Sequence, residues 1–221
     1  MDYERLYDYR FRRVDQRARE EVWKAITDHL YEELGRPSCV LDPAAGRGEF
    51  INSVPARERW AVDEVEYERS TFSEGVNFVQ SDIFEAELPA SHFDGILVSN
   101  FLEHLGTQEE TADFLSRMYR ATAPGGRIAI MGPNFRYCHD LYFDYADHTL
   151  VYTHLAIAEH LYTAGYEPVK VVPRYLPYSF TGRLPASRGL TNMYLRMPLA
   201  WRFLGKQFLV IGERPAGGSA E

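Results

Sequence analysis

Acidic residues at the ends of predicted strands, and a loop of small residues beside one of them, are the groups in this sequence that could do chemistry. Asp42 ends the apolar run 39–41, and a segment rich in alanine and glycine follows it as far as Gly48. Glycines at a strand end let the backbone approach a ligand closely and leave N–H groups to meet it. The pattern predicts a nucleotide-type loop between a buried strand and the start of a helix.

A second acid lies at the end of the next predicted strand. Asp63 ends the short apolar run that begins at Trp60, 21 residues beyond Asp42, and Glu64 is the adjacent alternative. A carboxylate at about that distance can accept both ribose hydroxyls of a nucleotide, because the second strand of a doubly wound sheet lies beside the first. The helix between these two strands is predicted to be short, because Pro55 interrupts it.

The elements that must position these acids are strands that alternate with helices. Residues 1–36 carry apolar side chains at helical spacing, and Thr153 is predicted to cap a helix over 154–164. Apolar and alternating runs predict strands at 39–42, 60–63, 76–83, 93–100, 128–131, 166–172 and 207–212.

Two nucleotide-loop types do not fit. No Gly-Lys-Ser/Thr follows the loop, so a Walker-type phosphate site is excluded, and the G-x-G-x-x-G dinucleotide pattern is absent. What remains, D-x-A-x-G-x-G after a first strand, resembles motif I of the class I S-adenosylmethionine-dependent methyltransferases. Ala44 stands where that family usually has its first glycine.

Later landmarks resemble the same family in the same order. The stretch FDGILVSNFLEHL, residues 93–105, resembles motif IV, and the Pro-Gly-Gly turn at 124–126 resembles the turn before the fifth strand. The resemblance covers residues 39–131. It implies an α/β fold, a doubly wound Rossmann-like sheet of seven strands, in which 207–212 forms the antiparallel edge strand.

The resemblance also implies a cofactor, S-adenosylmethionine, with S-adenosylhomocysteine as product. In the family the motif I loop faces the methionine part and ribose, the acid of the third strand accepts from the adenine amino group, and an N-terminal lid meets the methionine carboxylate. Carried onto this chain, these roles give a predicted cofactor site formed by Tyr7, Asp42, Ala44, Gly46, Gly48, Asp63, Glu64, Asp82, Ile83, Asn100 and Phe101.

Histidines and acids after the fourth and fifth strands are the candidate catalytic groups. An alcohol or a protonated amine must lose a proton before it accepts a methyl group, and histidine suits that task. We predict His148, His104 and Asp144 as catalytic, although His104 could also serve only in packing. The predicted acceptor-binding residues are Asn134, Tyr137, His139, Tyr145, Asp147 and Arg183. The two cysteines have no ligand spacing, and no metal site is predicted.

The acceptor class is the least specified prediction. Residues 134–211 resemble bacterial methyltransferases associated with sugar and cell-envelope polysaccharide assembly, and their aromatic, Asp and His content suits a carbohydrate. A natural-product pocket would look similar. We predict O-methylation of a small hydroxylated acceptor, with N-methylation of a small amine or amino sugar as the alternative. A third alternative is a protein that binds the cofactor in a regulatory role without transferring methyl.

Nucleic acid is an unfavoured partner. The loop opening Asp-Pro-Ala-Ala-Gly is similar to that of amino-methylating DNA enzymes, but the Asn-Pro-Pro-Tyr that grips an extruded base is replaced by Ser99-Asn100-Phe101-Leu102. The formal net charge of −8 also argues against a general nucleic-acid binder.

Charge is divided unevenly along the chain. Residues 173–206 hold five arginines, one lysine and no carboxylate, so this segment carries +6 and the remainder −14. We predict that it is an acceptor-side insertion whose cations lack local partners and meet a phosphorylated or lipid-linked acceptor, or a membrane surface. The alternative is an amphipathic segment, helical over 190–204, that packs on the core.

These features divide the chain into a predicted lid, core, insertion and tail. The boundaries are a helical lid at 1–36, a cofactor-binding core at 37–172, the insertion at 173–206, a last strand at 207–214 and a disordered tail at 215–221. No apolar run approaches the 18 or so residues of a membrane span, and the charged N-terminus is unlike a secretory signal. We expect a cytoplasmic location.

Overall fold

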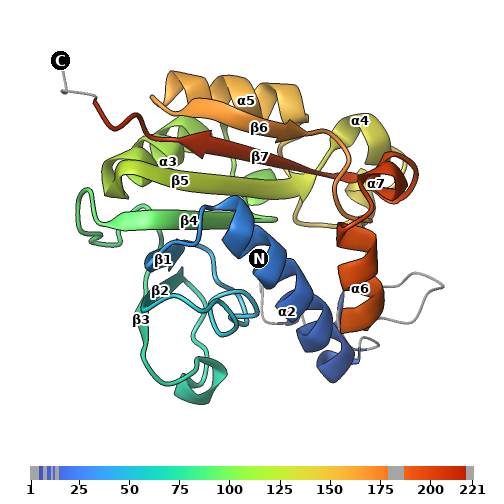
Figure 1. Cartoon of the computed structure of the whole chain (residues 1–221), viewed down its shortest axis with the longest axis horizontal. Helices are drawn as coiled ribbons and strands as arrows, with labels where there is room; N and C mark the ends of the chain where they lie inside the picture. The colour runs from blue at the N-terminus through green and yellow to red at the C-terminus, as the bar shows by residue number, and fades with distance from the viewer. Residues whose placement is uncertain (1–4, 7–8, 11, 13–14, 179–186, 218–221) are drawn as a thin grey trace.

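A seven-stranded mixed sheet forms the centre of the protein, as seen in a computed structural model that describes residues 5–6, 9–10, 12, 15–178 and 187–217 (Figure 1). The strands lie in the order β3-β2-β1-β4-β5-β7-β6. Their bounds are β1 (Cys39–Asp42), β2 (Glu58–Asp63), β3 (Val76–Gln80), β4 (Phe93–Ser99), β5 (Thr122–Pro133), β6 (Glu167–Val172) and β7 (Gln207–Glu213).

Strand direction confirms the predicted Rossmann-like fold. Strands β1 to β5 pair in parallel, whereas β7 is antiparallel to both β5 and β6. The edge position predicted for 207–212 belongs to β6, because β7 lies between β5 and β6. All four residues of β1 are buried, as expected for a central strand covered on both faces.

Helices cover the two faces of the sheet in separate layers (Figure 1). One apolar cluster joins α2 and the C-terminal helices to the sheet, and the other joins α3 and α5 to its opposite face. The α-helices are α2 (Gln16–Glu33), α3 (Gln108–Ala121), α4 (Phe135–Cys138), α5 (His154–Thr163), α6 (Arg188–Leu195) and α7 (Pro198–Leu204). The 3-10 turns are η1 (Arg69–Thr71), η2 (Leu102–His104) and η3 (Tyr142–Asp144).

Local capping explains where the helices begin. The Asp15 carboxylate accepts from the Arg17 backbone N–H at 3.0 Å at the start of α2, and the Thr153 hydroxyl accepts from Ala156 at 3.3 Å at the start of α5. The α5 cap is the one predicted from the sequence. In the predicted helical region 1–36, α2 accounts for 16–33.

The segment between β1 and β2 differs from its prediction, because turns replace the expected short helix. Asn52 donates to the Gly48 carbonyl and Val54 to the Phe50 carbonyl, each at 2.9 Å, which is a single helical turn. Pro55 follows at once and has no N–H to extend it.

The described part of the insertion 173–206 holds two short helices rather than the single helix expected over 190–204. Pro198 separates them by occupying the first position of α7, where its missing N–H costs nothing. Leu195 of α6 and Trp201 of α7 are buried in the cluster that includes α2. The insertion is therefore packed on the core by one face.

The expectation that the cations of the insertion lack partners is wrong for three of them. Arg188 pairs with Asp28 at 2.8 Å, and Lys206 lies 3.6 Å from the Asp140 carboxylate. Arg174 donates to the backbone carbonyl of Gly205 at 2.7 Å. Their charges are compensated within the fold, by carboxylates outside the insertion or by main-chain dipoles. No helix among the described residues is long and apolar enough to cross a membrane.

Candidate active site

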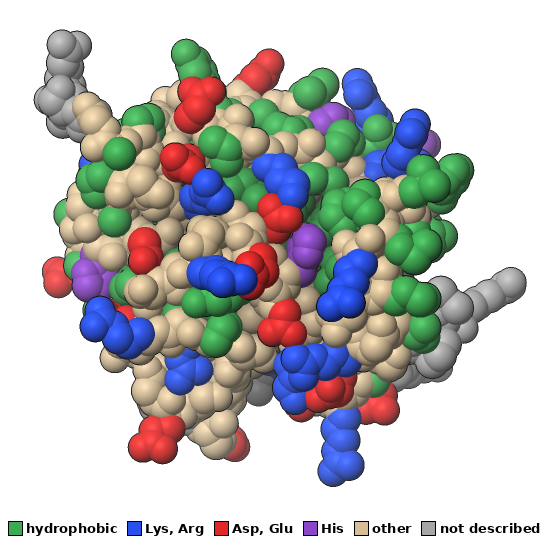
Figure 2. All heavy atoms as spheres, viewed as in Figure 1, with side chains coloured by type: hydrophobic (Ala, Val, Ile, Leu, Met, Phe, Trp, Pro, Cys, Tyr) green, Lys and Arg blue, Asp and Glu red, His purple; other side chains and the backbone are tan. Residues whose placement is uncertain are grey.

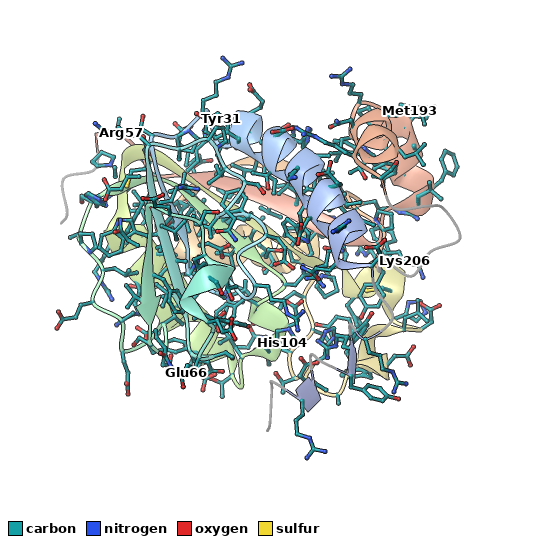
Figure 3. All side chains as sticks on the ribbon, turned by 90° about the horizontal axis from the view of Figure 1, so that it is seen from below. Tyr31, Arg57, Glu66, His104, Met193 and Lys206 are labelled. Atoms are coloured by element: carbon teal, nitrogen blue, oxygen red, sulfur yellow. The ribbon has the colours of Figure 1, made fainter. Side chains whose placement is uncertain are left out.

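A cavity of about 410 Å³ opens at the carboxyl ends of β1, β2 and β4. This volume lies in the range of pockets that hold small molecules and cofactors. His104 lies inward from Glu66, which marks the outer edge of the loop after β2 (Figure 3). Of the residues predicted to bind cofactor, those lining the cavity are Asp42, Ala44, Gly46, Asp63, Glu64, Asp82, Ile83, Asn100 and Phe101.

The two glycines of the loop after β1 have different roles. Both have positive φ, 53° at Gly46 and 73° at Gly48, which favours glycine. No heavy atom lies within 4 Å of where a Gly46 Cβ would stand, so this side of the loop is open to a ligand. A Gly48 Cβ would lie 2.9 Å from Asn52 Nδ2, and Gly48 does not line the cavity. Gly48 therefore shapes the loop, and only Gly46 faces the cavity.

Carboxylates line the side of the cavity formed by the ends of β1 and β2. Burial raises the pKa of Asp42 to about 8, and the nearby charges of Asp63 and Glu49 add to the shift while a hydrogen bond from the Ala44 backbone opposes it. Asp63 accepts from the backbone N–H of Gly46 at 2.7 Å and of Val65 at 2.9 Å. Asp63 thus fixes the loop, with lone pairs remaining for a ligand.

The neighbouring acids are less committed to the fold. The Glu64 side chain is exposed overall. Partial desolvation of its carboxyl and the charge of Asp82 nevertheless raise its pKa. The Asp82 carboxylate accepts from the Phe84 backbone N–H at 2.9 Å, and the buried Ile83 follows it along the cavity wall. At the end of β4, Asn100 has φ of 49° and donates its backbone N–H to the Met131 carbonyl at 2.8 Å.

Across the cavity, His104 is held by Asp147. His104 Nδ1 lies 3.0 Å from the Asp147 backbone carbonyl and 3.5 Å from its carboxylate. A carbonyl oxygen can only accept, so Nδ1 carries a proton, and Nε2 has a free lone pair whenever the ring is neutral. Arg10 donates to the other Asp147 carboxylate oxygen and lies over the Tyr145 ring, 4.7 Å from its centroid. Burial alone would raise the pKa of Asp147, but the Arg10 hydrogen bond and the His104 charge outweigh it and lower that pKa.

His148 lies beside His104, with ring centroids 5.2 Å apart. It stacks on Tyr145, and its Nδ1 is buried without a hydrogen-bond partner in the described structure. Burial, reinforced by the charge of His104, lowers the pKa of His148 to about 4, so the ring is neutral near pH 7. His148 is thus a weaker proton acceptor than its position suggests.

Among the described residues, two groups of side chains could hold a cation. Ligand atoms of Glu103, His104 and His148 lie within 4.8 Å of one another beside the cavity. Glu103 is 4% exposed, and burial raises the pKa of its carboxyl. A second group, formed by Cys39, Glu58 and His92, shares that spacing at the amino ends of β1, β2 and β4, at the opposite edge of the sheet.

Several predicted acceptor residues lie away from the cavity. Buried Asn134 caps α4. Its side-chain amide donates to His154 Nδ1 at 2.9 Å and to the Pro173 carbonyl at 2.7 Å, so it holds the start of α5 to the segment after β6. Tyr137 lies under the Arg174 guanidinium, 4.9 Å from its ring centroid. Neither residue lines the cavity, and neither does His139, which is exposed.

The two candidate aspartates, Asp144 and Asp147, lie in different surroundings. Asp144, predicted as catalytic, is exposed at the end of η3 and does not line the cavity. Asp147, predicted to bind acceptor, is buried against His104 and Arg10 instead. Tyr145, predicted to bind acceptor, lines the cavity, whereas Tyr7 and Arg183 lie outside the described residues.

The sequence-based prediction did not include some residues that line the cavity. Glu103 lay within the motif IV stretch and could have been found there. Arg19 of α2 forms an ion pair with Glu49 at 2.7 Å that ties the helix to the loop, and no local pattern marks that pair. Other cavity-lining residues that were missed include Arg10, Trp23, Arg47, Tyr67, Tyr178 and Gln207.

Comparisons with known proteins agree with this geometry. Residues 41–130 match the methyltransferase domain family. A S-adenosylmethionine-dependent methyltransferase of Archaeoglobus fulgidus superposes with a TM-score of 0.67 at 22% identity, over 96% of this chain and 100% of that one. No curated protein sequence matches the chain.

Two N-methyltransferases share the fold. The 1,6-didemethyltoxoflavin-N1-methyltransferase of Burkholderia thailandensis, solved with 1,6-didemethyltoxoflavin and S-adenosylhomocysteine, has a TM-score of 0.58 at 22% identity over 97% of this chain and 89% of that one. NodS of Bradyrhizobium japonicum, solved with S-adenosylhomocysteine, has a TM-score of 0.60 at 16% identity over 86% and 85%. At these identities the likeness establishes the fold, and it leaves the acceptor open.

Proposed function

We propose that this chain, a class I S-adenosylmethionine-dependent methyltransferase by its matched domain and fold, methylates an oxygen of a small hydroxylated acceptor with His104 as the base. The acceptor class is a sugar, a glycan precursor or a secondary metabolite. The observation that carries the proposal is the hydrogen bond from His104 Nδ1 to the Asp147 carbonyl, which leaves Nε2 able to accept a proton beside the cavity.

The cofactor fits the side of the cavity formed by the β1 and β2 ends. The open face of Gly46 admits a ligand against the backbone, and Asp63 keeps lone pairs for a ribose diol. Asp82 and Ile83 would hold the adenine, and Asn100 and Phe101 close the wall after β4. When bound there, S-adenosylmethionine supplies a methyl group on a positively charged sulfur.

On the acceptor side, His104 would take the hydroxyl proton on Nε2 as the new oxygen–carbon bond forms and the sulfur–carbon bond breaks. The bonding electrons of the broken bond go to sulfur, which becomes a neutral thioether. Asp147 holds the ring and balances the positive charge that His104 gains. The half-buried, neutral ring of His148 would help to exclude water from the same side.

Side chains around the acceptor side favour a hydroxylated molecule. The rings of Tyr145 and Tyr178 meet at 5.4 Å between centroids and give apolar faces to the cavity, while Glu103 and Gln207 give hydrogen-bonding groups. Apolar surfaces with a few polar groups are the usual lining of small-molecule sites. The buried thiols of Cys39 and Cys138 fit a cytoplasmic location, which is part of the proposal.

N-methylation is the second candidate, favoured by the fold shared with two N-methyltransferases. A neutral amine already has a lone pair and needs no base, whereas a hydroxyl does. The two candidates therefore differ in how strongly turnover depends on His104.

The test is transfer of labelled methyl from the cofactor to a panel of sugars, phenols and amines, followed by the matched variants His104→Asn and His148→Asn. Asparagine at position 104 keeps a donor for the Asp147 carbonyl but has no acceptor at the Nε2 position. We expect His104→Asn to lower kcat by roughly 10²- to 10⁴-fold and His148→Asn to lower it less, with cofactor Kd unchanged in both.

The other outcomes are equally specific. A small effect of His104→Asn with an amine as the only acceptor would establish N-methylation. Loss of activity on chelation, restored by a divalent cation, would assign Glu103, His104 and His148 to a metal rather than to base catalysis. Cofactor binding without transfer to any acceptor would leave a regulatory, non-transferring protein.

A further inference from the structure

The helices α6 and α7 are apolar on their outer face as well as on their inner face. Leu195 and Trp201 point into the core, where both are buried. A helix packed by one face on a soluble core normally carries polar side chains on the other. Here the outward side chains of this pair include six large hydrophobic residues that are 40% to 73% exposed: Leu190, Met193, Met197, Leu199, Phe203 and Leu204.

These six residues, called here the apolar patch, gather on one edge of the molecule. Figure 2 shows hydrophobic side chains in a band on the right, over the place that α6 and α7 occupy in Figure 1. Met193 lies at the outer margin, and α6 stands away from the strands (Figure 3). Contiguous exposed apolar surface of this kind marks an interaction site rather than ordinary surface.

The charges among the patch are of one sign. Arg196 and Arg202 are exposed in α6–α7, and no described carboxylate forms an ion pair with either. Asp28 and Asp140 pair with Arg188 and Lys206, two other cations of the insertion. The surface thus offers apolar side chains together with positive charge.

We propose that the apolar patch with Arg196 and Arg202 docks on an anionic lipid bilayer. Interfacial helices combine apolar side chains that enter the acyl boundary with arginines that meet lipid phosphates. A second copy of this chain fits less well, because a two-fold contact through the patch would bring the arginines of both copies together without a carboxylate from either patch.

The patch also lies at the same end of the sheet as the cavity. Tyr178, before the two helices, and Gln207, directly after them, both line the cavity. A bilayer bound by α6 and α7 would therefore approach the cavity from the acceptor side. The inference stands apart from the proposed chemistry, since it concerns binding alone.

Co-sedimentation with vesicles of phosphatidylcholine containing about one third phosphatidylglycerol tests this docking, with pure phosphatidylcholine vesicles for comparison. We expect binding to the anionic vesicles, weakened by high salt. Leu199→Ser with Phe203→Ser should lower partitioning at least tenfold, because two exposed apolar side chains are lost. Arg196→Gln with Arg202→Gln should lower it roughly 10- to 30-fold at low salt only.

The matched control replaces two exposed hydrophobic residues of α5, Leu155→Ser with Tyr162→Ser, and should partition like the parent. Parent protein that ignores anionic vesicles would overturn the proposal. Sedimentation velocity distinguishes the rival: a dimer that dissociates in Leu199→Ser with Phe203→Ser, without vesicle binding, would assign the patch to a second copy.

Discussion

The two sides of the cavity are assembled over very different distances along the chain. On the cofactor side, the Asp63 carboxylate accepts from Gly46 only 17 residues away, and both residues flank neighbouring strands. On the acceptor side, His104 meets Asp147 across 43 residues, and Arg10 reaches Asp147 across 137. The ends of parallel strands thus supply the cofactor side, and short segments from three distant parts of the chain supply the acceptor side.

This difference has a structural cause. Parallel strands end at one edge of the sheet, so an acid after each strand is brought to its neighbours by the pairing itself. Asp42 lies opposite Ala61, two residues before Asp63. No such rule places η3 and the loop after it, which are held by Thr149 donating to the Glu103 carbonyl at 2.9 Å. The acceptor side therefore depends on contacts between distant parts of the chain.

Among variants of Asp63, Asp147 and His148, the largest effect is expected for Asp63, on the cofactor side. Asp63→Ala removes the support of Gly46 and the proposed ribose contact, and should weaken S-adenosylhomocysteine binding by roughly 1.5 to 3 kcal/mol, about 10- to 150-fold in Kd. The exposed neighbour provides the control, since Glu64→Ala should change Kd less. Calorimetry measures both.

A ribose analogue separates the two roles of Asp63. With a 2′,3′-dideoxy form of S-adenosylhomocysteine, Asp63→Ala should cost much less than with the full ligand, because the diol contact is already gone. Equal losses for both ligands would mean that Asp63 serves only the loop. A larger loss in Glu64→Ala would move the ribose contact to Glu64.

The same contrast explains what the sequence could foretell. Asp42 and Asp63 end strands that their apolar runs reveal, and Asp82 follows the end of β3 by two residues. The sheet and the acids that it brings to the cavity were therefore predictable from local pattern. The different burial of Asp144 and Asp147 was not predictable, because the two residues lie three positions apart in an irregular loop whose path depends on distant partners. The position of β7 inside the sheet was likewise set by pairing rather than by its composition.

An intermediate effect is expected from Asp147→Asn. The Asp147 backbone carbonyl remains, but the charge that balances His104 and pairs with Arg10 is lost, so kcat should fall roughly 10- to 100-fold, or about 1.4 to 2.8 kcal/mol. Asp144→Asn, in the same loop but exposed, is the matched control and should keep kcat within about twofold. Cofactor Kd should stay constant in both. The reverse ranking of the two variants would return the role to Asp144.

The smallest effect concerns stability and pH. Burial holds the pKa of His148 at about 4 in the folded chain, whereas an unperturbed histidine titrates near 6.5. Between these values the unfolded chain binds more protons than the folded one, so this residue lowers stability as pH falls from 6.5 toward 4. Since the ring is only partly shielded from solvent, the loss should be about 1 kcal/mol rather than the full shift.

Thermal or urea unfolding at pH 7 and pH 5 measures this loss in the parent, in His148→Gln and in the exposed control His139→Gln. Carboxylates also titrate in this range, so the informative quantity is the difference between parent and variant at each pH. His148→Gln should lose about 1 kcal/mol less than the parent on acidification, because the side chain that must stay neutral is gone. His139→Gln should follow the parent. An equal loss of stability on acidification in all three proteins would mean that protons reach the His148 ring without unfolding. The acceptor side would then open to solvent more readily than the cofactor side.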